Sequence, residues 1–268
     1  MGNFKIKNDN RRPLISVITV GLNAKKYIEQ CIQSVIKQDY HDFEYVVIDG
    51  GSTDGTIEII ERYNDRISYW HTKKDRGLAH AFNEGVKNSN GNWLLFLNSD
   101  DVFVNNEILS NMSSVLINNK NADVVFGQVN IVSREQEPSK IGGPYGGPFK
   151  WSQFLTQDTI PHQSAFTNML FFKQVGMFDE DFKIAVDYEH YLRAGPDIQT
   201  IFYPLIIANM RDGGLSQKNI FETLVDCHKA RVKNNSATYI IVLTILVYLM
   251  LRAYIGRCVR KYILYINK

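Results

Sequence analysis

The sequence has few cysteines, and none of them is spaced for a structural role. Cys31, Cys227 and Cys258 are odd in number and far apart, which argues against a disulfide framework and against a zinc site. The chain has only seven prolines and is 44% hydrophobic over 268 residues. Such a composition is typical of a globular protein with one sizeable core, or with two lobes that share a sheet. We expect it to fold unaided in a reducing compartment.

Several short motifs are also absent. The first twenty residues reach an apolar segment without the small-residue cleavage site of a signal peptide, so no export is expected. Ile6 stands where a myristoylation signal needs Ser or Thr. The glycines of GGSTDG, residues 50–55, do not form the G-x-G-x-x-G of a nicotinamide-binding oxidoreductase. That class of enzyme is therefore disfavoured.

Acidic residues are missing from the C-terminal part of the chain. Residues 227–268 hold eight of the 30 Lys and Arg and none of the 28 Asp and Glu, so the preceding residues carry 22 basic against 28 acidic side chains. An acidic body would repel a phosphate backbone, which predicts no nucleic-acid partner. The basic tail instead indicates an anionic surface as its partner.

The same tail contains an apolar run. Residues 237–251 are fifteen residues without a charge, about 22 Å as a helix, which is shorter than the roughly 30 Å of a bilayer core. A full span is therefore not expected. Beyond the run, Arg257, Arg260 and Lys261 share one helical face, which predicts that residues 236–268 lie in an anionic membrane interface. The alternative is a core helix with a solvated end.

Short apolar runs alternate with helical patterns through the first hundred residues. Strands are predicted over 14–20, 43–48, 67–71 and 93–97, and helices over 24–37, 56–63 and 78–87. This alternation predicts an α/β fold with a doubly wound, mainly parallel sheet.

The pattern is looser after residue 101. We predict a strand over 123–129 and an irregular loop over IGGPYGGP, residues 141–148, because of its glycines and prolines. Helices are expected over 107–117, 171–175, 186–193 and 221–233. Residues 1–101 would form a nucleotide-binding half, and residues 102–235 would form a half that receives the other substrate and holds the catalytic group.

Acidic side chains stand where predicted strands end. They are Asp49, Asp75 and the pair Asp100 and Asp101. Ligand sites of open α/β sheets form at the carboxyl ends of the strands, so these acids should share one pocket. Carboxylates there suit a divalent cation and the hydroxyls of a nucleotide sugar.

An ordered set of segments between about residues 14 and 216 resembles the family 2 glycosyltransferases, inverting nucleotide-sugar enzymes of GT-A (nucleotide-diphospho-sugar transferase) fold. The segments are SVITVGLNA, SVIKQDY, FEYVVIDGGSTDGT, DRGLAHAFNEG, LLFLNSDD, HQSAF, VGMFDEDF, DYEHYLR and GGLS. Each is weak alone, but their order over about three-quarters of the chain is specific. The Q-x-x-R-W element of processive polysaccharide synthases is absent.

The resemblance implies a metal site at the D-x-D element, which reads Asn98-Ser99-Asp100 here. Asp100 would hold Mn²⁺ or Mg²⁺, and Asn98 could bond a ribose but brings no charge, so an Asp at position 98 is expected to be tolerated. Gly50 also departs from the family, which commonly has a second acid there. The alternatives are a helix cap at residues 99–101 and a tight turn at Asp49.

The remaining roles are likewise implied by the resemblance. The residues expected to contact the donor are Asp49, Asp75, Gly77, Asn98, Asp100, His162 and Gln163. Asp187 in DYEHYLR would be the general base, with Glu189 as the main alternative and Asp179 and Glu180 as weaker ones.

The function implied is transfer of one sugar, from a UDP-sugar in the first instance, to a hydroxyl of a lipid-linked saccharide acceptor. The setting would be synthesis of O-antigen, capsule or exopolysaccharide at the cytoplasmic face of the bacterial inner membrane, with a peripheral or monotopic enzyme. The alternative is a catalytically inactive nucleotide-sugar-binding or scaffold protein at the membrane.

Overall fold

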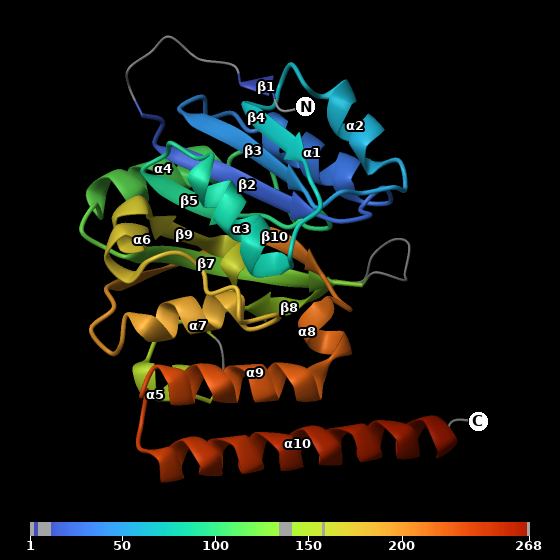
Figure 1. The fold of residues 1–268 in the computed structure, drawn as a ribbon, viewed down its shortest axis with the longest axis vertical. Helices are drawn as coiled ribbons and strands as arrows, with labels where there is room; N and C mark the ends of the chain where they lie inside the picture. The colour runs from blue at the N-terminus through green and yellow to red at the C-terminus, as the bar shows by residue number, and fades with distance from the viewer. Residues whose placement is uncertain (1–2, 5–11, 134–140, 157–158, 267–268) are drawn as a thin grey trace.

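A computed structural model describes residues 3–4, 12–133, 141–156 and 159–266. These residues form one ten-stranded sheet in the order β1-β4-β3-β2-β5-β9-β7-β10-β6, with β8 paired to β7 (Figure 1). The strands are β1 (Asn3–Phe4), β2 (Ile15–Gly21), β3 (Phe43–Asp49), β4 (Tyr69–Thr72), β5 (Trp93–Phe96), β6 (Val102–Phe103), β7 (Val124–Val132), β8 (Ile141–Tyr145), β9 (Ala165–Asn168) and β10 (Thr200–Arg211).

Six of these strands run in one direction. The neighbours β4, β3, β2 and β5 are parallel, and so are β7 and β10. Between β5 and β7 lies β9, which is antiparallel to both, so β7 and β10 keep the direction of β5. The predicted α/β fold with a mainly parallel sheet is confirmed.

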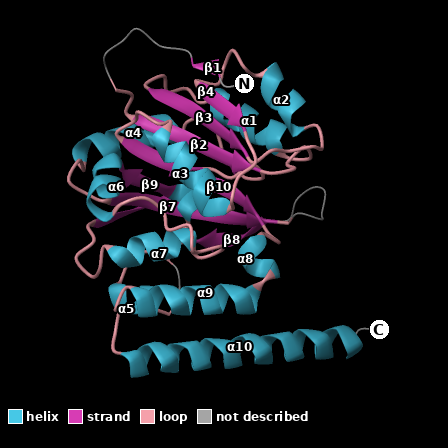
Figure 2. Ribbon diagram, in the orientation of Figure 1, coloured by secondary structure: helices cyan, strands magenta, loops and turns pink. Residues whose placement is uncertain are grey.

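Helices cover both faces of the sheet (Figure 2). They are α1 (Ile28–Ile36), α2 (Thr56–Arg62), α3 (Leu78–Lys87), α4 (Ile108–Asn118), α5 (Trp151–Phe154), α6 (Met169–Val175), α7 (Val186–Arg193), α8 (Leu215–Lys218), α9 (Ile220–Lys233) and α10 (Tyr239–Ile266). Successive strand residues point to opposite faces. Val47 therefore packs in the core under α1, α2 and α4, while Val46 packs in the core under α3, α6 and α7.

The predicted loop at residues 141–148 is wrong over its first part, because Ile141–Tyr145 forms β8. This strand pairs antiparallel with β7, with Pro144 opposite Asn130. Within the described residues β8 pairs with β7 alone, so it is an edge strand, where a proline without an N–H is tolerated.

The described part of the tail folds as one helix, α10, which packs against α9 below the α/β body in Figure 1. The segment Tyr239–Val259 of α10 is long and apolar enough to cross a membrane by length and composition, and most of it is exposed. The expectation that the apolar run is too short for a span is therefore wrong. The helix continues through Arg252, and 21 residues extend about 31 Å.

Candidate active site

The carboxyl ends of the parallel strands place the predicted acids at one edge of the sheet. Asp49 ends β3 and Arg211 ends β10. Asp100 lies just beyond β5, where the backbone still follows β2 through a bond from Ser99 N to Val20 O of 3.2 Å. These residues come from distant parts of the sequence and meet at this edge because their strands run in the same direction.

Asp49 is buried and holds the turn after β3. Its Oδ2 accepts hydrogen bonds from the backbone N–H groups of Gly51 (3.0 Å) and Ser52 (2.9 Å) and from Thr72 Oγ1 (2.6 Å). The carboxylate thus ties the turn to the end of β4, which is the structural role considered from the sequence. Its contact with a donor stays a prediction.

Asp75 and Gly77 form the loop that leads into α3. The Oδ1 of Asp75 accepts from Gly77 N at 3.0 Å. Gly77 has φ +126°, and no atom lies within 4 Å of where its Cβ would be. A ligand could therefore approach the Gly77 backbone closely.

A chain of hydrogen bonds joins this edge to α7. Asn98 Nδ2 lies 2.9 Å from His162 Nε2, and His162 Nδ1 lies 3.0 Å from Asp187 Oδ2. His162 and Asp187 are both partly exposed, at 22% and 19% of their side chains. The structure thus brings together three residues that the sequence assigned to the donor site and to the base.

The carboxyl of Asp187 is set up to be ionised. Burial raises its pKa most, but the hydrogen bonds from His162 and from the backbone N–H of Tyr188, with the charge that His162 carries when it is protonated, together lower the pKa below the ordinary 3.8. At neutral pH Asp187 is therefore a carboxylate that can accept a proton. Glu189 differs, because it is fully buried and forms an ion pair with Arg193 at 2.9 Å.

Asp101 lies behind Asp100 and is nearly inaccessible. Its Oδ1 accepts from Arg211 N at 3.0 Å, and its Oδ2 accepts from Gln163 Nε2 at 3.1 Å. Burial and the charge of Asp100 raise the pKa of Asp101 to about 7. Gln163, predicted to contact the donor, is 4% exposed and supports Asp101.

Arg211 is the site residue that sequence reasoning missed. Its guanidinium donates to the backbone oxygen of Asp100 and to Gln30 Oε1 (2.6 Å), and stacks 4.5 Å from the ring centre of Tyr27. It brings a cation to the edge where the acids gather. The sequence feature that could have indicated Arg211 is its position two residues before GGLS, one of the segments that resemble the family.

The side chains at this edge of the sheet are suited to bind a divalent metal ion together with the phosphates of a ligand. Among the residues described, no group of three or more His, Cys, Asp or Glu side chains could hold a metal. Mg²⁺ is commonly bound by one or two carboxylates together with substrate phosphates. Asp100 offers a carboxylate, and Asn98 Oδ1 is a buried oxygen that accepts no hydrogen bond. These two oxygens suit a metal ion that is bound jointly by the protein and by the diphosphate of a ligand. Within the described residues, no metal site is formed by protein side chains alone.

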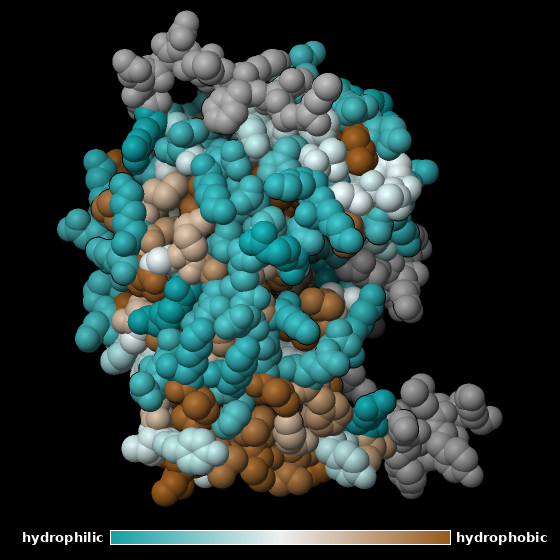
Figure 3. Space-filling view, viewed as in Figure 1, coloured by the Kyte–Doolittle hydropathy of each residue, from teal (hydrophilic) through white to brown (hydrophobic). Residues whose placement is uncertain are grey.

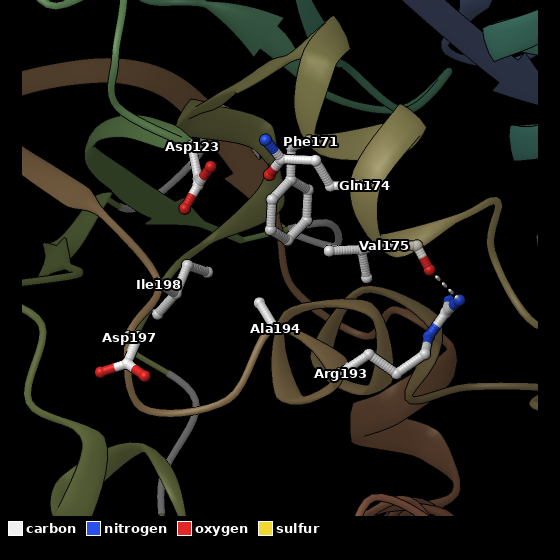
Figure 4. A pocket seen from close by; sticks show the side chains of 8 residues that line it. All are labelled: Asp123, Phe171, Gln174, Val175, Arg193, Ala194, Asp197 and Ile198. Carbon is white, nitrogen blue, oxygen red and sulfur yellow. Dashed lines mark hydrogen bonds between the residues drawn. The ribbon is translucent and has the colours of Figure 1, made fainter.

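The structure also has a cavity of about 460 Å³ at the opposite edge of the sheet (Figure 4). Asp123 and Ile198, which line it, come just before the starts of β7 and β10. Arg193 points toward its rim but is bonded to Val175 O at 3.1 Å. None of the predicted site residues lines this cavity, and its polar side chains suggest no chemistry.

Comparison with known families decides the class of the protein. The model of glycosyl transferase family 2 matches residues 16–176, which is more than half of the chain. The chain belongs to glycosyl transferase family 2. This family 2 glycosyltransferase is 29% identical over 220 residues to a PGL/p-HBAD biosynthesis glycosyltransferase of Mycobacterium bovis (strain BCG / Pasteur 1173P2), covering 80% of this chain and 81% of that protein. It is 31% identical over 186 residues to an uncharacterized glycosyltransferase of Mycobacterium tuberculosis (strain CDC 1551 / Oshkosh), covering 68% and 69%.

Solved structures show the same fold as this glycosyltransferase. S. aureus TarS 1–349 in complex with UDP matches with a TM-score of 0.63 and 20% identity, over 90% of this chain and 71% of that one. The mannosyltransferase PcManGT from Pyrobaculum calidifontis, in complex with GDP-Man and Mn²⁺, matches with a TM-score of 0.65 and 18% identity, over 90% and 70%. The predicted GT-A fold is thereby confirmed.

Proposed function

We propose that this glycosyltransferase is an inverting enzyme that moves one sugar from a nucleotide-sugar donor to a hydroxyl of a lipid-linked saccharide acceptor in bacterial surface-polysaccharide synthesis. The observation that carries the proposal is the contact chain from Asn98 through His162 to Asp187. In this chain, only the imidazole of His162 separates the candidate base Asp187 from Asn98, which lies two residues before Asp100.

The donor would bind at the carboxyl ends of β3, β4 and β5, so that residues 1–101 form the donor half. Asp75, Gly77 and Asn98 would contact a ribose or base there, Asn98 through its buried Oδ1, which accepts no hydrogen bond, and Asp49 and Gln163 hold the surrounding turns. A UDP-sugar is the first candidate, because TarS was solved with UDP and with UDP-GlcNAc. PcManGT was solved with GDP-Man, so GDP-sugars are the comparison.

A metal would be held by Asp100 together with the diphosphate oxygens. When bound, Mn²⁺ or Mg²⁺ neutralises the leaving nucleoside diphosphate without a proton transfer. The cation Arg211 lies at the same edge and bonds the backbone of Asp100. This guanidinium would add positive charge near the leaving group and keep the Asp100 loop in place.

Asp187 would perform the proton transfer from residues 102–235, the acceptor half. The acceptor oxygen bonds to the anomeric carbon from the face opposite the nucleotide, the bond from that carbon to the diphosphate oxygen breaks, and Asp187 takes the hydroxyl proton. One displacement inverts the anomeric centre. General-base assistance of this kind is worth about 10²–10⁴ in rate.

The tail would bring the enzyme to the lipid that carries the acceptor. Apolar side chains gather over α9 and α10 in Figure 3, while the body is mostly polar. The large exposed apolar residues of α10 include Ile240, Val247, Leu251, Tyr254 and Ile255. With the acid-free sequence after residue 226, this surface suits the anionic cytoplasmic face of the inner membrane. Its length also permits a span.

A thermal-shift panel with UDP, GDP, TDP and NAD, each with and without Mn²⁺, tests the donor class, because a ligand of the native state raises the melting temperature. We expect UDP with Mn²⁺ to give the largest shift. Transfer from the matching radiolabelled sugar to a lipid extract then tests the reaction. Donor binding without transfer to any lipid acceptor would favour the inactive binding protein, and a shift with NAD alone would overturn the proposal.

A further inference from the structure

The two nitrogens of His162 face groups of opposite hydrogen-bonding character. Nδ1 lies 3.0 Å from the Asp187 carboxylate, and Nε2 lies 2.9 Å from the Asn98 amide nitrogen. An ionised carboxylate only accepts hydrogen bonds, and an amide NH₂ only donates them. Both contacts are satisfied by one form of the ring, the neutral imidazole with its proton on Nδ1.

This arrangement removes His162 from proton transfer. Its Nε2 lone pair is occupied by Asn98, so the imidazole has no free basic site for an acceptor hydroxyl. Asp187 keeps lone pairs for a further bond, because within the described part of the chain Oδ1 accepts from Tyr188 N (2.9 Å) and Oδ2 accepts from His162. Each carboxylate oxygen can accept more than one bond.

We propose that Asn98 is a positioning residue that keeps Nε2 of His162 unprotonated, so that the ring stays in the one neutral form that Asp187 accepts, and that His162 in turn orients Asp187 as the base. The inference rests on the proposed function only in assigning the base to Asp187. Asn98 can do this because its amide has two ends. Nδ2 bonds the imidazole, and Oδ1 is buried and accepts no hydrogen bond.

The contact with His162 explains why this chain has Asn98 where the family usually has an aspartate. An aspartate at position 98 has no N–H to offer, so it would face Nε2 with an oxygen. His162 would then have to carry a proton on both nitrogens, between two carboxylates. The sequence alone suggests that Asn98→Asp is tolerated, whereas the contact with His162 predicts that it impairs the enzyme.

The protonation of His162 can be measured without any assay of turnover. The full-length protein is labelled with ¹⁵N-histidine, and His162 is assigned among the six histidines by comparison with His162→Gln. In the wild-type protein we expect a protonated-type Nδ1 signal and an unprotonated-type Nε2 signal at neutral pH. Asn98→Asp should give two protonated-type signals. Asn98→Ala removes the donor to Nε2 while Asp187 still holds the proton on Nδ1, so it should shift the Nε2 signal toward the protonated type.

The control is Asn92→Asp, which changes an exposed asparagine just before β5. It should leave the His162 signals unchanged. A wild-type His162 with its proton on Nε2, or on both nitrogens, would overturn the proposal. The second result would mean that Asn98 presents its oxygen to a cationic ring. An Asn98→Ala spectrum identical to wild type would overturn it as well.

Kinetics give an independent readout. Asn98→Ala should lower kcat about 10- to 100-fold, within the range of lost general-base assistance, while the donor KM changes less than about threefold. Asn98→Asp should lose at least as much kcat, and wild-type turnover in that variant contradicts the positioning role. If the wild-type protein transfers no sugar, the proposed function fails, and the spectra still decide whether Asn98 keeps Nε2 of His162 unprotonated.

Discussion

The carboxylate of Asp75 occupies the space beside Gly50. A Cβ placed on Gly50 would stand 2.4 Å from Asp75 Oδ2, which is closer than two such atoms can approach. The backbone joins the two residues as well, because Asp75 N lies 3.4 Å from Gly50 O. The glycine that departs from the family pattern therefore makes room for an acid from the next loop.

Gly50→Ala should displace Asp75 and weaken donor binding. We expect its donor Kd to rise about as much as that of Asp75→Ala, with little loss of stability, because the atom that must move is the end of a partly exposed side chain. The double variant Gly50→Ala/Asp75→Ala should bind no worse than either single variant, because the two changes act on one contact. Isothermal titration with the donor nucleotide measures all three. Additive losses would show that Asp75 does not mediate the effect.

Asp100→Ala should abolish metal-dependent turnover and leave the fold intact. The backbone oxygen that accepts from Arg211 is kept in the variant, so the loop should hold its position. Turnover is measured against Mn²⁺ concentration and in EDTA, with exposed Asp39→Ala as the control. Full activity of Asp100→Ala, or wild-type activity that EDTA does not change, would rule out the metal role.

Asp187→Asn should lower turnover at least about 100-fold while the donor Kd stays within a few-fold, because the amide keeps the shape but cannot take the proton. Glu189→Gln is the contrasting variant. It breaks the buried pair with Arg193 and should cost about 3 kcal/mol of stability. Urea unfolding and single-turnover kinetics separate the two effects. If Glu189→Gln loses turnover at full stability and Asp187→Asn does not, the base is Glu189.

His190 should make the protein acid-sensitive. Burial among Phe171, Phe172 and Phe178 lowers its pKa from 6.5 to about 3. Between these values the unfolded chain binds a proton that the folded protein does not. The free energy of unfolding therefore falls as pH drops below 6.5, by up to about 1.4 kcal/mol per pH unit for this one group.

His190→Gln tests this dependence, since its amide can still donate to Gly176 O as the imidazole does at 2.8 Å. The free energy of unfolding in urea, measured from pH 7 to pH 4.5, should fall less steeply in the variant than in the wild type. Exposed His41→Gln should keep the wild-type slope. Equal slopes in all three proteins would mean that His190 becomes protonated in the folded state.

The tail should control membrane binding. Reversing Arg257, Arg260 and Lys261 to Glu should weaken binding to anionic vesicles more than to neutral ones, at about 1 kcal/mol per basic charge removed. Truncation after residue 235 should free the protein from vesicles and spare transfer to a soluble acceptor analogue. Co-sedimentation at several salt concentrations measures both, with exposed Lys37, Lys120 and Lys173 reversed as the control. A full-length protein that stays in the supernatant with anionic vesicles at low salt would rule out the membrane role of α10.

The first half of the sheet could be predicted from sequence because its strands are buried on both faces. Residues 15–20 and 45–49 are continuous buried runs, and such runs between helical patterns are typical of parallel strands. Among the later strands, the strand predicted over 123–129 is confirmed as β7, and β10 was not predicted. In β10, Pro204 and a register shift between Phe202 and Ile206 interrupt the alternation, so this twelve-residue strand was missed.

The positions of the acidic residues in the candidate site could be predicted from the sequence, but the hydrogen bonds between distant residues around them could not. Strand ends indicated Asp49, Asp75 and Asp100, since the end of a strand is a local property of the sequence. The pairing of Asn98 with His162 joins residues 64 positions apart, and that of Arg211 with Asp100 joins residues 111 apart. Such contacts depend on how β9 and β10 enter the sheet, which no local pattern encodes.

The hydrogen-bonded ladder that runs from β2 through β5 to β9 has a mechanical consequence. The strands before residue 101 and those after it are one continuous sheet, so the two sides of the site cannot swing apart on a hinge without breaking ladder bonds. Admission of a sugar nucleotide and departure of the spent nucleotide must instead come from motion of the loops at the sheet edge. Because Asn98 follows β5 and His162 precedes β9, the pairing of these two strands sets the separation of the two residues in the candidate site.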